Sequence, residues 1–275
     1  MKGRQVASLE ERVLEMAGRR RELAEKLRFF DAEIWLGQPA GFPLARELPA
    51  DKLGAALQER AISGGLVSHW RGNTVSAQEG NEAVIRALKQ SPENTYVTWT
   101  ALPLLPGESG ALPGAGRAPA ELRAARIFPR THNFPLVPWC VGSLCEWLSG
   151  RKMPLFVWHT ETDWTSLHAL AQAFPGLMIV VESQPRKILY HTRPLFALMR
   201  DCRNVRLEIS NFAGQGFIEY AVREFGAERL IFGSFLPMND PRVAMGMVLD
   251  ARVSEVEKSL IAGGNLRRII AEVIP

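Results

Sequence analysis

Polar side chains, most of them acidic, imidazole or hydroxyl groups that can move protons, recur where short apolar runs of this 275-residue sequence end. Parallel strands place such terminal residues at one edge of a sheet, where α/β enzymes gather their chemistry. The set is Glu33, His69, Arg71, His159, Glu161, Glu182, Ser183, Glu208, Ser210 and Ser234. We expect Glu33, His159 and Glu182 to be the catalytic group. One buried carboxyl can stay protonated beside another and act as an acid, while His159 or the second carboxylate acts as the base.

Two other interpretations of the same three side chains stay open. Glu33, His159 and Glu182 could ligate a divalent ion such as Zn or Mn in a Glu-His-Glu arrangement. Alternatively, each carboxylate pairs with an arginine or lysine and the histidine is a hydrogen-bonded core residue, as buried polar groups usually are. We expect no cofactor, with the Zn or Mn site as the alternative.

Substrate recognition is expected from a second set of residues near the same strand ends. Arg71 and Arg126 could receive a substrate carboxylate, since a planar guanidinium binds both carboxylate oxygens at once. The plainer alternative is that either arginine neutralises Glu33 or Glu182. The whole expected substrate-binding set is Arg71, Arg126, His69, Trp35 and Ser234. Four tryptophans also lie near strand ends, and alternation along a strand sends only some of them inward; they are Trp35, Trp70, Trp99 and Trp158.

The elements that must position these residues are eight short apolar runs that read as strands. They are Phe30–Trp35, Gly65–His69, Thr95–Thr100, Ala124–Phe128, Leu155–His159, Met178–Glu182, Val205–Ser210 and Arg229–Gly233. The stretch Leu177–Val181 is apolar throughout, which is typical of a parallel strand covered on both faces.

Helical spacing of apolar residues separates these strands. The predicted helices are Asp51–Arg60, Ala77–Lys89, Pro135–Leu148, Ser166–Phe174, Arg193–Asp201, Gly216–Phe225, Pro241–Ala251 and Ser254–Val273. Eight strand and helix units in succession favour one closed (β/α)₈ barrel domain over residues 30–275, although an open doubly wound sheet would share the local pattern.

Two further segments lie outside this alternation of strands and helices. Ser8 and Glu11 form a capping-box pattern, and apolar residues at helical spacing predict a leading helix within residues 1–29. We expect it to pack on the barrel or to extend from it and pair with another subunit as a homodimer contact. Leu104–Pro119 is rich in Gly and Pro and predicts a long loop over the strand ends, either a lid or an insertion without function.

Composition excludes several classes of protein. The 33 basic and 29 acidic residues give a net charge of only +4, and the basic run Arg19–Arg21 is followed by acidic residues, so no nucleic-acid partner is expected. Three cysteines without C-x-x-C spacing indicate neither a disulfide framework nor a zinc knuckle. The absence of a signal core and of any apolar run of about 20 residues predicts a cytoplasmic protein without membrane partners.

Three motifs in order resemble the amidohydrolase-related family of metal-dependent hydrolases and decarboxylases, from Phe30 to the C-terminus. That family reads Asp-x-His-x-His on its first strand, Phe-Gly-Ser-Asp-x-Pro on its last and Gly-Asn-x-x-Arg in its closing helix. The corresponding segments here are Asp31-Ala32-Glu33-Ile34-Trp35, Phe232-Gly233-Ser234-Phe235-Leu236-Pro237 and Gly264-Asn265-Leu266-Arg267-Arg268.

The resemblance implies that most metal positions have changed. When these segments are matched to the family's motifs, the family's first-strand histidines correspond to Glu33 and Trp35. Its fifth-strand histidine corresponds to His159, its sixth-strand histidine to Glu182 and its eighth-strand aspartate to Phe235. Trp and Phe offer a metal no lone pair, so the ancestral centre is broken. In the family the aspartate is also the general base, so Phe235 removes a ligand and a proton acceptor together.

Two functions follow as expectations. The first is a metal-independent hydrolase or lyase that acts on a small, carboxylated organic substrate through Glu and His acid–base chemistry, and it predicts an open polar pocket. The alternative is a non-catalytic barrel that binds a ligand or a protein partner, and it predicts that Trp35 and Phe235 close the pocket.

Overall fold

A computed structural model describes residues 8–39, 46–89, 91–103, 119–186 and 188–274. All eight predicted strands are present and pair in parallel in the order β1 to β8. Their bounds are β1 Phe29–Leu36, β2 Ile62–His69, β3 Thr95–Thr100, β4 Leu122–Ile127, β5 Leu155–Trp158, β6 Ile179–Glu182, β7 Val205–Glu208 and β8 Leu230–Ile231. The backbone N–H of Ala32 donates to the oxygen of Phe232 at 3.0 Å, and that of Trp35 to Leu236 at 2.8 Å. These bonds join β1 to the segment around β8, so the expected (β/α)₈ barrel is confirmed.

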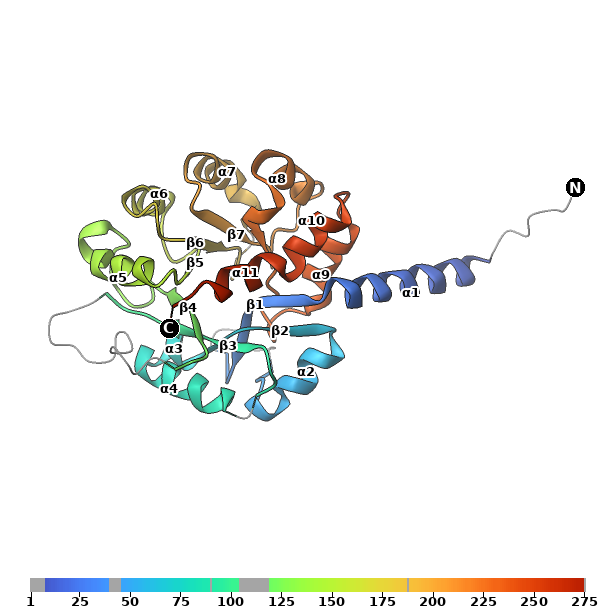
Figure 1. The fold of residues 1–275 in the computed structure, drawn as a ribbon, viewed down its shortest axis with the longest axis horizontal. Coiled ribbons are helices and arrows are strands. Elements are labelled where there is room, and N and C mark those ends of the chain that lie inside the picture. The colour runs from blue at the N-terminus through green and yellow to red at the C-terminus, as the bar shows by residue number, and fades with distance from the viewer. Residues whose placement is uncertain (1–7, 40–45, 90, 104–118, 187, 275) are drawn as a thin grey trace, which may run out of the picture.

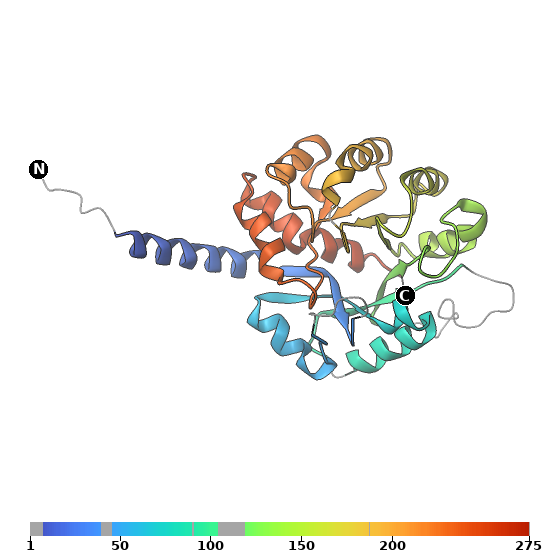
Figure 2. The ribbon, with the colours of Figure 1, turned by 180° about the vertical axis from the view of Figure 1, so that it is seen from behind.

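Helices surround the strands in both views along the barrel (Figure 1, Figure 2). The helices are α1 Leu9–Leu27, α2 Leu53–Glu59, α3 Arg71–Thr74, α4 Ala77–Leu88, α5 Pro138–Gly150, α6 Trp164–Ala173, α7 Thr192–Asp201, α8 Phe217–Phe225, α9 Pro241–Asp250, α10 Glu255–Ser259 and α11 Asn265–Ala271. Short 3-10 turns occupy Ala50–Lys52, Ile188–His191 and Ala227–Arg229. No helix in the described ranges combines the length and apolar character needed to cross a membrane.

The predicted closing helix Ser254–Val273 is interrupted, which corrects the sequence expectation. A π-helical turn over Leu260–Gly264 separates α10 from α11. A Cβ atom added to Gly263 would lie 2.9 Å from Cβ of Phe30, so the backbone approaches β1 more closely than a side chain allows. Two consecutive glycines also weaken a regular helix. The predicted loop Leu104–Pro119 lies outside the described residues except for Pro119.

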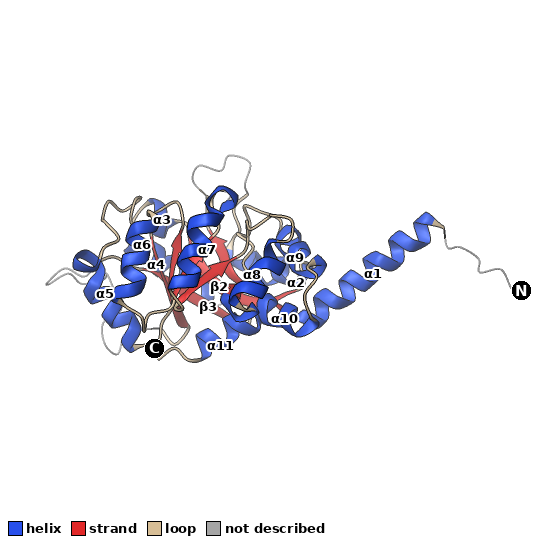
Figure 3. Cartoon of the chain, turned by 90° about the horizontal axis from the view of Figure 1, so that it is seen from above, coloured by secondary structure: helices blue, strands red, loops and turns tan. Residues whose placement is uncertain are grey.

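The leading helix α1 begins at the predicted capping box. The Ser8 hydroxyl accepts from the backbone N–H of Glu11 at 3.1 Å, and the Glu11 carboxylate accepts from the N–H of Ser8 at 2.7 Å. Only its last turns bury side chains, at Ala24 and Leu27. The first turns project away from the barrel into solvent (Figure 1, Figure 3).

The interior of the barrel is layered because alternate residues of each strand point inward. On β2 and just beyond it, Leu66, Ser68 and Trp70 belong successively to an apolar, a polar and an aromatic layer. On β4 the same order runs through Ala124, Arg126 and Phe128. The apolar layer lies toward the amino ends of the strands, and the aromatic layer lies toward their carboxyl ends.

Candidate functional site

A buried ion pair lies in the polar layer of the barrel. Arg126 on β4 donates from Nε to Oε2 of Glu182 on β6 at 3.0 Å and from Nη2 to Oε1 at 2.5 Å. The two side chains are 1% and 0% exposed. Arg126 also donates to the Ser68 hydroxyl and to the backbone oxygen of Ala32. The structure therefore pairs the proposed substrate-binding arginine with the proposed catalytic Glu182, which is the plainer alternative raised by the sequence.

Glu33, the second proposed catalytic residue, lies in the same layer. Its carboxylate accepts from the indole nitrogen of Trp158 at 2.8 Å and from the Ser210 hydroxyl at 3.3 Å. Burial raises the pKa of Glu33 well above its usual range, and the nearby carboxylates of Glu182 and Glu208 raise it further. A raised pKa favours the protonated form of this carboxyl at neutral pH.

Glu208, at the end of β7, adds a third buried carboxyl. It accepts from the backbone N–H and hydroxyl of Ser183, both at 3.2 Å, and from the hydroxyl of Ser210 at 2.9 Å. Burial, followed by the charge of Glu182, raises the pKa of Glu208 to about 8. Among the described residues of this layer, three carboxyls thus share the guanidinium of Arg126. Because a buried charge needs a partner, this imbalance keeps carboxyl protons bound at neutral pH.

An irregularity in β1 turns Glu33 toward this layer. Asp31 is opposite Gly65 and Ile34 is opposite Val67, so β1 uses one residue more than β2 between these pairs. Such a bulge resets the alternation of side chains along the strand. The sequence motif shows the residues of β1, but it gives no sign of this shift.

Asp31 and Ser234 connect the first strand to the segment after the last. The Ser234 hydroxyl donates to Asp31, and the backbone N–H of Ser234 donates to Oδ1 of Asp31 at 2.9 Å. Oδ1 also accepts from the N–H of Glu33 at 2.9 Å. Burial raises the pKa of Asp31 to about 6. The proposed substrate-binding residue Ser234 is thus buried and holds the barrel seam.

Five aromatic side chains cover the polar layer at the carboxyl ends of the strands. This aromatic cluster consists of Trp35, Trp70, Phe128, Trp158 and Phe235. Trp35 stacks on Trp70 with ring centroids 4.5 Å apart, and Trp158 meets Phe235 edge to face at 5.9 Å. Each such pair contributes about 0.5–1.5 kcal/mol beyond burial of its area. Trp35 and Phe235, which correspond to metal-ligand positions of the family, are both in this cluster.

His159 lies at the edge of the cluster, directly after β5. Its Nδ1 is 3.2 Å from the backbone oxygen of Glu182, and its ring centroid is 5.6 Å from that of the exposed His191. Burial lowers the pKa of His159 to about 4, so the imidazole is neutral at pH 7. The contact with Glu182 is to its backbone; the side chain of Glu182 turns to Arg126.

The other proposed binding residues, His69 and Arg71, line a separate pocket of about 770 Å³, which we call the rim pocket. It lies at the carboxyl ends of β1 and β2. Its described walls are Leu36, Gly37, Gln38, Glu47, Leu48, Pro49, Ala50, His69, Arg71, Thr74, Val75, Ala83, Arg86 and Ala87. Burial, followed by the charges of Arg71 and Arg86, lowers the pKa of His69 to about 4.

The residues of the polar layer do not fit a shared divalent metal. Metal ligands must converge at about 2 Å on one point. Both oxygens of Glu182 accept from Arg126, and those of Glu33 accept from Trp158 and Ser210. Within the described ranges, Glu33, His159 and Glu182 do not form a group whose ligand atoms all lie within 4.8 Å of one another.

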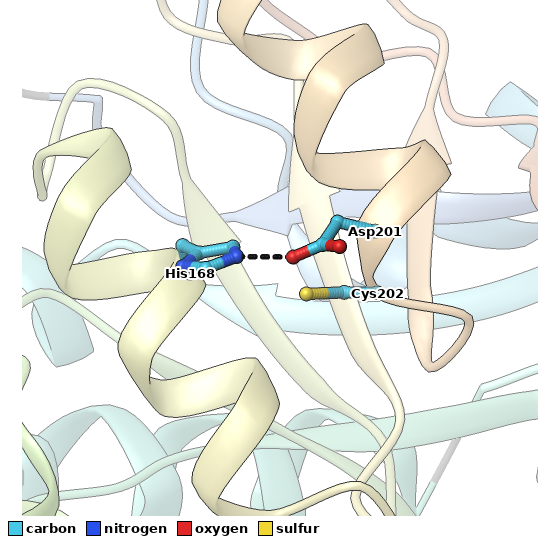
Figure 4. Close-up of side chains that lie close together, drawn as sticks. All are labelled: His168, Asp201 and Cys202. Carbon is cyan, nitrogen blue, oxygen red and sulfur yellow. Dashed lines mark hydrogen bonds and ion pairs between the residues drawn. The ribbon is translucent and has the colours of Figure 1, made fainter.

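One group of possible ligands does meet that distance, on the outside of the barrel. His168 of α6 lies beside Asp201 and Cys202 at the end of α7 (Figure 4). Nε2 of His168 is 2.5 Å from Oδ2 of Asp201, which also accepts from Gln172 at 3.1 Å. An ion would have to displace these bonds, and packing of α6 against α7 accounts for the contact.

Sequence reasoning missed three features of the site. The Asp31–Ser234 contact and the role of Glu208 had no sequence signal beyond their positions at strand ends. Phe128 could have been found, because it continues the alternation of Ala124 and Arg126 along β4. Glu161, in the polar set, accepts from the backbone N–H of Thr131 at 2.8 Å and orders the loop after β4.

No protein-family model and no curated protein sequence matches this chain. Solved structures do. The 5-carboxyvanillate decarboxylase of Sphingomonas paucimobilis is 15% identical over 90% of this chain and 100% of its own, with a TM-score of 0.66. An amidohydrolase of Burkholderia multivorans with bound zinc is 15% identical over 88% and 99%, with a TM-score of 0.63. A 2,6-dihydroxybenzoate decarboxylase from Rhizobium is 11% identical over 88% and 98%, with a TM-score of 0.65.

These identities are too low to transfer an activity, and what they establish is the fold. The likeness covers 88–90% of this chain, and the similar structures include an amidohydrolase and a decarboxylase, as the sequence resemblance implied. The chain therefore has the barrel fold of the amidohydrolase-related proteins.

Proposed function

We propose that this chain binds a small carboxylated organic molecule in the rim pocket. The observation that carries the proposal is the meeting of two arginines and a neutral imidazole in an open pocket at the carboxyl end of the barrel. Among the described residues, Arg71 pairs only with Glu79 and Arg86 only with Glu82, each over a long distance of 3.6 Å. Their guanidinium groups therefore retain donors for a carboxylate, which they can bind through two oxygens.

His69 adds a neutral donor to this pocket. Its Nδ1 accepts from the backbone N–H of Arg71 at 3.2 Å, so the hydrogen of the neutral ring belongs on Nε2. A neutral donor beside two cations suits an anionic ligand. Glu47 also lines the pocket and favours a ligand that has a donor group beside its carboxylate.

The class of ligand is supported by the proteins that share the fold. Two of the structural neighbours are decarboxylases named for 5-carboxyvanillate and 2,6-dihydroxybenzoate, which are carboxylated aromatic compounds. The barrel axis is a poorer place for such a ligand here, because the aromatic cluster fills it and Arg126 is paired with Glu182.

A hydrolase or lyase reaction on that ligand is the second candidate function. The raised pKa values of Glu33 and Glu208 favour it, because perturbed carboxyls beside a neutral imidazole are a feature of acid–base sites. In this version, Glu33 or Glu182 supplies a proton and His159 accepts one. The chemistry requires that the ligand displace part of the aromatic cluster.

Calorimetric titration with 2,6-dihydroxybenzoate and related benzoates tests the binding proposal. The double variant Arg71→Gln/Arg86→Gln should weaken binding by at least about a hundredfold, because it removes two charged contacts of roughly 1.5–3 kcal/mol each. The matched control is Arg223→Gln/Arg242→Gln, which removes two exposed arginines elsewhere. Equal affinity in all three proteins would contradict the proposed pocket.

Turnover separates the two candidate functions. Product formation from the same benzoates should be followed with and without added Zn or Mn, in the wild type and in Glu33→Gln and His159→Asn. Binding without product supports the non-catalytic barrel. Product that disappears in both variants, while binding persists, establishes the hydrolase or lyase instead.

A further inference from the structure

The projecting part of α1 carries an apolar stripe that nothing in the described structure covers. Leu9, Val13 and Met16 are 77%, 55% and 63% exposed. Their spacing of four and three residues is the heptad spacing of coiled coils, and it continues through Arg20, Leu23 and Leu27. The same stripe is buried against the barrel at Leu27 and open to solvent at Leu9.

Such a helix lacks the packing that stabilises helices in proteins. Isolated helices shorter than about 12–15 residues are marginal in water, and most helical stability in proteins comes from burying an apolar face. The base of α1 is held by the buried side chains of Ala24 and Leu27 and by two surface ion pairs, Arg20 with Asp250 at 3.1 Å and Lys26 with Glu255 at 2.5 Å. The first three turns need a partner.

The charges of α1 indicate which partner fits. Residues 9–18 carry three acidic side chains and one basic one, a net charge of −2. Residues 19–27 carry four basic and two acidic side chains, a net charge of +2. A second copy running antiparallel with Val13 opposite Met16 places the acidic first turn, with Glu10 and Glu11, beside Arg19 and Arg20 of the other copy, whereas a parallel copy places like charges together.

Helix α9, which borders the base of α1, offers additional apolar surface to a second copy. On α9, Val243, Gly246 and Asp250 are spaced by three and four residues and so share one face. Asp250 pairs with Arg20, and a Cβ at Gly246 would lie 3.2 Å from Nη2 of Arg20, so this face borders α1. Val243 on it is 60% exposed.

We propose that this chain forms a two-fold homodimer in which the α1 helices pair antiparallel. Val13 of one copy lies opposite Met16 of the other, and the tip of each helix reaches the α9 face that carries Val243. Stable interfaces bury roughly 800 Å² on each partner, which is more than the tip of one helix supplies, so both the helix and the α9 face take part. A two-fold axis makes the two contacts identical.

Sedimentation equilibrium of the full chain tests the dimer. The wild type should have twice the monomer mass, and the triple variant Leu9→Glu/Val13→Glu/Met16→Glu should be a monomer. The matched control is Val75→Glu, which places a charge at another exposed valine and should remain dimeric. The melting temperature of the barrel checks that each variant is folded. A monomeric wild type, or a dimeric triple variant, would overturn the proposal.

Cross-linking tests the orientation of the helices. In the antiparallel pair the two Leu9 positions lie about 16 Å apart, from the rise of 1.5 Å per residue, which a disulfide cannot span. Leu9→Cys should therefore form no disulfide dimer on mild oxidation, and the double variant Val13→Cys/Met16→Cys should form one. A disulfide dimer of Leu9→Cys would instead show parallel helices and overturn this arrangement.

Discussion

The guanidinium of Arg126 lies against the ring of Trp35, 4.8 Å from its centroid, while it holds the carboxylate of Glu182 at 3.0 Å. This contact joins the polar layer of the barrel to the aromatic cluster above it. In an open active site the arginine and the carboxylate would face a substrate. Here a tryptophan occupies that position, so the carboxyl end of the axis is packed like a core.

The buried ion pair predicts that replacing one partner lowers the free energy of unfolding strongly, whereas replacing both partners lowers it little. Arg126→Met should lower the free energy of unfolding by about 3–5 kcal/mol, because it leaves the buried Glu182 without a counter-charge. Adding Glu182→Met should recover most of this loss, since a pair of apolar side chains can replace a buried ion pair. Urea denaturation at pH 7 measures both. A single variant within about 1 kcal/mol of wild type would contradict the pairing.

The raised pKa of Glu208 predicts that stability falls between pH 6.5 and 8. Above its ordinary pKa of 4.5 the unfolded carboxyl is ionised, whereas the folded one stays protonated up to about 8. The folded state thus binds more protons in this window, and raising the pH favours unfolding. The lowered pKa values of His69 and His159 affect the stability of the fold only below about pH 6.5.

Denaturation at several pH values checks this slope. Glu208→Gln should have a flatter dependence than the wild type between pH 6.5 and 8, because it removes one titrating group. Glu47→Gln, at an acidic residue of the rim pocket that lies outside the buried layer, serves as the control and should keep the wild-type slope. Identical slopes in all three proteins would mean that Glu208 ionises normally.

The backbone conformation of Phe235 predicts that its glycine variant is more stable than its alanine variant, the reverse of the usual order. Its φ of 60° lies in the left-handed region, which costs residues with a Cβ roughly 1–2 kcal/mol and costs glycine nothing. Removing the ring should destabilise the protein by about 3–5 kcal/mol in both Phe235→Ala and Phe235→Gly. The glycine variant should nevertheless be the more stable of the two. At Phe128, which has an ordinary backbone conformation, the alanine variant should be the more stable.

Gly37 predicts a way to disturb the rim pocket without changing its charges. Its φ is 80°, and an added Cβ would lie 2.5 Å from Cε1 of His69. Gly37→Ala should displace the imidazole and weaken benzoate binding by roughly tenfold, the effect of one lost hydrogen bond of about 1.4 kcal/mol. Gly150→Ala, where no atom lies within 4 Å of the added Cβ, should bind normally in the same titration.

The fold was predictable because each strand is a short apolar run between helical segments, and all eight runs lie within three residues of the observed strands. The site was less predictable. Sequence places Arg126 and Glu182 near the ends of the fourth and sixth predicted strands, but it does not show which of two arginines meets which carboxylate. The extra residue in β1 that turns Glu33 inward depends on pairing with β2, and pairing register is not visible in a single sequence.

The rim pocket shows the same limit. His69 and Arg71 were expected to serve the same site as Glu33 and His159, because all four follow strands at one end of the barrel. The structure separates them, since His69 and Arg71 line the rim pocket while the aromatic cluster covers the polar layer. That cluster assembles from five segments far apart in the sequence, and the packing of its rings depends on closure of the barrel.

A crystal structure of the chain with bound 2,6-dihydroxybenzoate tests the central claim most directly. We predict that the carboxylate lies between Arg71 and Arg86 in the rim pocket and that Trp35 remains stacked on Trp70. A ligand on the barrel axis, with the aromatic cluster displaced and the carboxylate in contact with Arg126, would contradict this account.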